Sequence, residues 1–133
     1  MSIILALMAA GTAAVADIRP LLRQQGFIWP INGRETIAYV GAIRQGSARY
    51  QIYLYHGVFR ASEVDHGANK LIVMRNGSTY FGAYDSGLTK TCRVRRLRVI
   101  CDRQWVIEFT KRGPPALALI DGYIVQIDRG SRK

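Results

Sequence analysis

Two glycine-containing dipeptides, Asn76-Gly77 and Asp121-Gly122, constrain this chain more than any other feature. Each suits a type I′ turn, which needs positive φ at both central positions and joins neighbouring antiparallel strands. The flanking runs are LIVMR and STYFGAY around the first turn, and ALALI and YIVQI around the second. Because these runs are rich in β-branched and aromatic residues, they predict two β-hairpins and direct the chain toward antiparallel sheet.

A two-residue turn also sets the register of each hairpin. The predicted pairs are Arg75 with Ser78, Met74 with Thr79, Val73 with Tyr80 and Ile72 with Phe81 in the first hairpin, and Ile120 with Tyr123, Leu119 with Ile124 and Ala118 with Val125 in the second. A third hairpin is expected between ETIAYVGAIR and ARYQIYLYHGVF, which flank residues 45–47. On its first strand we expect Ile37, Tyr39, Gly41 and Ile43 to share one face. Gly41 and Gly82, inside strands, indicate bulges or tight bends.

These signals recur along the chain and predict an all-β fold. We expect an antiparallel meander of about nine or ten short strands, forming a small barrel or a sandwich. The length of 133 residues fits a single β domain at 27–133. No helix is expected within 27–128, whereas the extension at 17–26 is compatible with one short helix.

The first sixteen residues, MSIILALMAAGTAAVA, carry no charged side chain and end in a small-x-small triplet before Asp17. This hydrophobic segment, 1–16, is typical of a secretory signal peptide, although no Lys or Arg precedes the apolar run. It is shorter than the roughly 20 apolar residues that a membrane-spanning helix needs. Cleavage, retention as an anchor and packing as a buried helix all remain open.

The two cysteines enclose the sequence TCRVRRLRVIC at 91–101. Pairing Cys92 with Cys101 places Val94 opposite Val99, with a turn at the centre. The cysteines and valines then share one face, and the arginines project from the other. This agreement favours a disulfide-linked hairpin, which is typical of an exported protein. A zinc site would need further Cys or His ligands at suitable spacing, and a redox pair is normally closer in sequence.

The formal net charge is +10, and six basic residues gather around this hairpin. They are Lys90, Arg93, Arg95, Arg96, Arg98 and Arg103. The cluster is a candidate binding face for an anionic partner, such as an acidic protein, an envelope component or a membrane surface. The alternative is that these charges only solubilise the domain or protect an edge strand from aggregation.

A second cluster contains His56, Glu63, Asp65 and His66. Two histidines with carboxylates are the residue types of a metal site or of acid–base hydrolysis, but their spacing is not diagnostic. The sequence contains no phosphate-binding loop, nucleophile elbow, zinc-protease motif or dinucleotide fingerprint.

The sequence therefore predicts a periplasmic or secreted β protein that binds without catalysis and needs no cofactor. Its expected partner is anionic, and export argues against nucleic acid as that partner. Two alternatives remain: a structural subunit of a membrane-associated assembly held by an uncleaved N-terminal helix, or a small hydrolase or metal site around the histidines.

Overall fold

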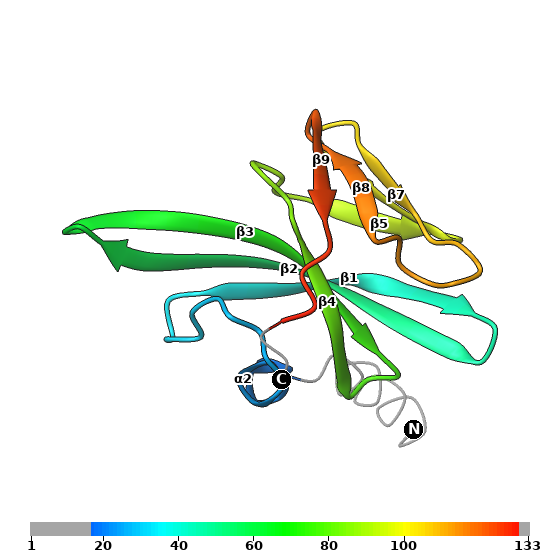
Figure 1. Cartoon of the computed structure of the whole chain (residues 1–133), viewed down its shortest axis with the longest axis horizontal. Coiled ribbons are helices and arrows are strands. Elements are labelled where there is room, and N and C mark those ends of the chain that lie inside the picture. The colour runs from blue at the N-terminus through cyan, green and yellow to red at the C-terminus, as the bar shows by residue number, and fades with distance from the viewer. Residues whose placement is uncertain (1–16, 131–133) are drawn as a thin grey trace, which may run out of the picture.

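The computed structural model describes residues 17–130, so the signal-like segment at 1–16 lies outside the described residues. The described elements are one helix, α2 (Arg19–Gln24), and the strands β1 (Thr36–Gln45), β2 (Ala48–Ala61), β3 (Val64–Arg75), β4 (Thr79–Asp85), β5 (Cys92–Arg95), β6 (Arg98–Cys101), β7 (Val106–Glu108), β8 (Leu117–Ile120) and β9 (Tyr123–Gln126). They form sheets in the orders β1-β2-β3-β4, β5-β6-β7 and β8-β9, and all pairings are antiparallel (Figure 1). The predicted all-β class is confirmed, as is a short helix within 17–26.

The four-stranded sheet lies between two hydrophobic cores. Side chains alternate along β2, so Ile52 faces one core, whereas Tyr53 and Tyr55 face the other. The first core is closed by residues of β6, β7 and β8, and the second by α2 and the segment that leads to β1. Since aromatic side chains occupy both faces of β2, this central strand is covered on both sides.

The sheets do not close into a barrel within the described residues. Strands β1 and β4 are the two edges of the larger sheet and do not pair with each other. A single bridge between Ala83 and Asp128 contacts the outer edge of β4. The β5–β9 part packs as a layer on one face, so the arrangement is layered and open (Figure 1).

A bulge divides β1 and corrects the expectation that its apolar residues share one face. The register with β2 shifts between Tyr39 and Gly41, so Tyr39 packs in the second core while Ile43 is fully buried in the first. A Cβ atom on Gly41 would lie 3.0 Å from the Cβ of Val94. Glycine here therefore lets β5 approach β1 closely, and the bulge predicted from this residue is confirmed.

The predicted register around Asn76-Gly77 is wrong by one residue. Both residues have positive φ, 53° and 81°, but Arg75 pairs with Thr79, because Ser78 also belongs to the loop. The Asn76 side chain accepts a hydrogen bond from the backbone N–H of Arg49, on the neighbouring strand. A second shift between Val73 and Met74 moves the rest of the strand further out of the predicted register.

The pairs predicted around Asp121-Gly122 and between the two cysteines all occur. The hairpin expected around residues 45–47 forms as well, but Gln45 belongs to β1 and pairs with Ala48, so the turn is shorter than expected. Local turn chemistry therefore sets these registers.

Candidate functional site

The β5–β6 hairpin carries the disulfide between Cys92 and Cys101, which occupy directly opposed positions. On the same face Val99 is fully buried in the first core, with Val94 packed against it. At the turn, Arg96 adopts a positive φ of 56°. The predicted hairpin and disulfide are confirmed. The disulfide, with Cys101 buried, fits an oxidising compartment.

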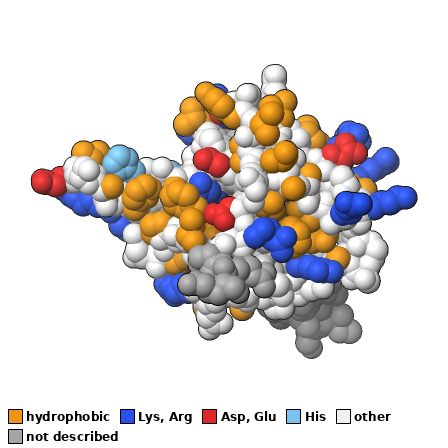
Figure 2. All heavy atoms as spheres, in the orientation of Figure 1, with side chains coloured by type: hydrophobic (Ala, Val, Ile, Leu, Met, Phe, Trp, Pro, Cys, Tyr) orange, Lys and Arg blue, Asp and Glu red, His pale blue; other side chains and the backbone are white. Residues whose placement is uncertain are grey.

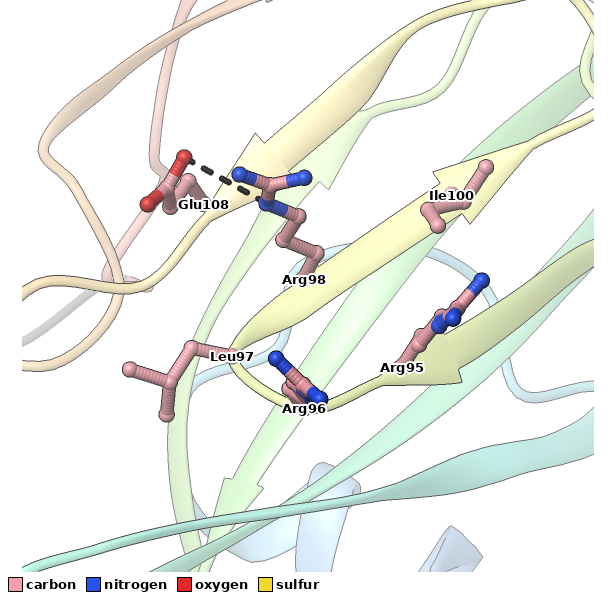
Figure 3. Close-up of a pocket in the computed structure, with 6 residues that line it drawn as sticks. All are labelled: Arg95, Arg96, Leu97, Arg98, Ile100 and Glu108. Atoms are coloured by element: carbon pink, nitrogen blue, oxygen red, sulfur yellow. Dashed lines mark ion pairs between the residues drawn. The ribbon is translucent and has the colours of Figure 1, made fainter.

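On the outward face of β5, β6 and β7, directly opposed side chains form rows that run across the three strands. In the row nearest the turn, Arg95 lies opposite Arg98, which lies opposite Glu108. The Nε atom of Arg98 and a carboxylate oxygen of Glu108 are 3.6 Å apart, and both side chains are exposed. As Figure 3 shows, Arg98 reaches toward this carboxylate. Glu108 therefore offsets only part of the repulsion between the two opposed arginines.

These side chains border a shallow hollow of about 430 Å³ (Figure 3). Its lining consists of Arg95, Arg96, Leu97, Arg98, Ile100 and Glu108. Within residues 17–130, Arg93, Arg95 and Arg96 form no ion pair, and all three are exposed. Guanidinium groups present several N–H donors in a planar fork that matches carboxylate, phosphate and sulfate oxygens. We call Arg93, Arg95, Arg96 and Arg98 the arginine face.

Lys90 and Arg103 lie apart from the hairpin turn, at the opposite end of the hairpin. Both line a second hollow of about 650 Å³, together with His56 and Asn69. Arg103 Nε is 2.7 Å from a carboxylate oxygen of Asp121. The six predicted basic residues thus occupy two hollows and the strand between them, rather than one continuous patch.

The histidine cluster is not brought together. His56 and Phe59 are three residues apart on β2, so they project from opposite faces of the hairpin. His66 pairs with Phe59 and stacks on its ring, with ring centroids 5.5 Å apart. His56 instead contacts the side chain of Asn69.

The two carboxylates of that cluster lie near the tip of the same hairpin. Glu63 lies in the turn between β2 and β3, and Asp65 is 3.2 Å from the guanidinium of Arg34. Among residues 17–130, no group of three or more His, Cys, Asp or Glu side chains is arranged to hold a metal ion. The described geometry therefore offers no converging set for metal or acid–base chemistry here.

Sequence reasoning missed an exposed apolar surface on β8 and β9. Leu119 and Ile124, directly opposed on these strands, are 63% and 76% exposed. Leu117 and Tyr123 are exposed as well. In Figure 2 hydrophobic side chains lie at the top of the molecule, along the arm on the left and near the centre, and Lys and Arg side chains cluster at the right. The sequence pattern that could have revealed this surface is in the runs ALALI and YIVQI, which are apolar at nearly every position instead of at alternate positions.

No protein-family model, curated protein or solved structure matches the chain significantly. In the described part of the chain, no helix has the length and apolar character required to cross a membrane.

Proposed function

We propose that this protein is a small exported binding protein, without a catalytic role, whose arginine face binds an anionic partner. The observation that carries the proposal is the set of three exposed arginines, Arg93, Arg95 and Arg96, that have no ion-pair partner among residues 17–130. The disulfide supports export to an oxidising compartment.

The scaffold under the arginine face suits this role. The disulfide and the buried Val99 hold the two strands, so the backbone positions of the arginines are fixed before a partner arrives. Arg95 and Arg98 lie directly opposite each other, and like charges at such positions destabilise a sheet slightly. An anionic group between them would remove that repulsion and accept hydrogen bonds from both guanidinium groups.

The first experiment measures binding of the full chain to a soluble sulfated polysaccharide by titration calorimetry at rising salt concentration. Affinity should fall steeply with salt, because mobile ions screen exposed charges beyond about 8–10 Å. Replacing Arg95, Arg96 and Arg98 together by Ser should weaken binding. At about 1 kcal/mol for each basic side chain beside a dense negative surface, the expected loss is about 100-fold.

A matched control changes Arg23, Arg34 and Arg60 to Ser, which lowers the net charge by the same amount. These three exposed arginines lie on α2, before β1 and near the β2–β3 tip, away from the hairpin turn (Figure 1). The control should keep most of the affinity. Equal weakening by both variants would mean that net charge alone drives binding, and salt-insensitive binding would contradict the proposal directly.

A further inference from the structure

The outer face of the β8–β9 hairpin has no covering element among the described residues. Ala118, Ile120 and Val125 of this hairpin pack on the first core. The alternate positions Leu117, Leu119 and Ile124 project outward, and are 59%, 63% and 76% exposed. Side chains that stand out this far from a sheet form a raised surface rather than a groove.

This apolar face continues into the arginine face. Ile100 on β6 lies opposite the exposed Val106 on β7. Val106 and Leu119 line the same shallow hollow between β7 and β8, and Leu119 pairs with Ile124. One continuous surface therefore runs from the arginines at the β5–β6 turn, across β7, to the outer side of β9. We call it the amphipathic surface.

The charges along the amphipathic surface favour one kind of occupant. Its carboxylate Glu108 pairs with Arg98, and the neighbouring Asp121 pairs with Arg103, while Arg93 and Arg95 have no acidic partner in the described chain. A second copy docking through the same surface would bring its own arginines toward these, within a chain of net charge +10. A planar anionic partner with an apolar interior would satisfy both parts of the surface.

We propose that the amphipathic surface docks onto a bilayer that contains anionic phospholipid. Leu119, Ile124 and Val106 enter the headgroup–acyl boundary, and the arginines bind lipid phosphates at its edge. This is the binding mode of interfacial elements, in which buried apolar area and electrostatic attraction act together. The inference rests on the proposed function, because it identifies the anionic partner of the arginine face.

The test uses sedimentation of the full chain with vesicles of phosphatidylcholine alone or mixed with phosphatidylglycerol. Wild type should bind only the mixed vesicles, and less so at high salt. Changing Leu119 and Ile124 together to Ser should weaken vesicle binding about tenfold or more, because two aliphatic side chains no longer leave water. Binding to the soluble polysaccharide should stay unchanged. A control, Ile28→Ser with Val64→Ser, removes two exposed aliphatic side chains from elsewhere and should keep vesicle binding.

Each outcome separates this inference from the proposed function. Salt-sensitive polysaccharide binding without vesicle binding would overturn the inference and leave the arginine face as a site for another anion. If wild type bound neither the polysaccharide nor the mixed vesicles, both the proposed function and this inference would be refuted. If vesicle binding survived the Leu119 and Ile124 changes, charge alone would account for it, and the proposed insertion of the apolar side chains would be refuted. A concentration-dependent dimer abolished by those changes would identify a second copy as the occupant and refute the bilayer proposal.

Discussion

Changing Glu35 to Gln should destabilise the protein strongly at neutral pH and much less in acid. The Glu35 side chain is 1% exposed and lies 2.7 Å from Nε of Arg19, in α2. Its other oxygen accepts hydrogen bonds from the backbone N–H groups of Asn32 and Gly33. The carboxylate thus joins the helix to the segment that enters β1, and both belong to the layer over the second core.

The size of the effect follows from the pKa of this carboxyl. Burial raises the pKa of Glu35, but the hydrogen bonds from Arg19, Gly33 and Asn32 outweigh it and lower the pKa from 4.5 to about 2. At roughly 1.4 kcal/mol per pH unit, ionised Glu35 contributes about 3 kcal/mol to the free energy of unfolding. Because the folded-state pKa is depressed, this contribution is complete above about pH 4.5 and disappears as the pH falls toward 2.

Urea denaturation of wild type and Glu35→Gln, near pH 7 and near pH 2.5, measures this contribution. We expect a loss of about 2–3 kcal/mol in the variant at neutral pH, since Gln keeps the acceptor but loses the charge. The difference should shrink markedly in acid. Glu63→Gln, at an exposed turn, is the control and should change stability by less than about 0.5 kcal/mol. A difference that stays constant down to about pH 2.5 would refute the assigned role of the ionised carboxylate.

Three further variants test the packing of the first core and its hairpins. Gly82→Ala should cost about 1–3 kcal/mol of unfolding free energy, because the new Cβ would lie 2.8 Å from the Ile127 side chain; an unchanged urea midpoint would contradict that contact. Replacing Cys92 and Cys101 by Ser should remove roughly 2.5–3 kcal/mol and make stability insensitive to reductant, as thermal scans with and without dithiothreitol would show. Trp105→Phe should cost about 1–2 kcal/mol, since its buried indole N–H donates to a threonine hydroxyl at 2.8 Å; a stability equal to wild type would argue against this hydrogen bond.

Features governed by neighbouring residues could be predicted from the sequence. The Cys92–Cys101 pairing and the hairpin at Asp121-Gly122 depend on a turn of two residues and on alternation of side chains, both of which are visible in a short window. The outward orientation of the arginines followed from the same alternation. Hence the register of the β5–β6 hairpin and the side of the sheet on which its arginines lie were predicted correctly.

The consequences of contacts between distant segments could not be predicted. Gly41 indicated a bulge in β1, but not that this bulge would place Tyr39 and Ile43 in different cores, where β5 packs on Gly41. The Asn76-Gly77 hairpin slipped by one residue, in a loop held by hydrogen bonds to Arg49 that the local sequence does not reveal. In both cases tertiary packing overrides the register that the turn alone would give.

In the β8–β9 hairpin the local sequence pattern is more apolar than the position of the hairpin in the fold requires. An unbroken apolar run is the pattern of a strand segment covered on both faces, and the run IYLY at 52–55 of β2 is covered in this way. Yet β8 and β9 form a two-stranded sheet with only one face on the core, so folding does not require Leu119 and Ile124 to be apolar. Polar residues at these positions would keep the core contacts of Ile120 and Val125 and would avoid exposing hydrocarbon to water. The apolar outer face is therefore better explained by an external contact than by the stability of the fold, and its junction with the arginine face through Val106 suggests where that contact begins.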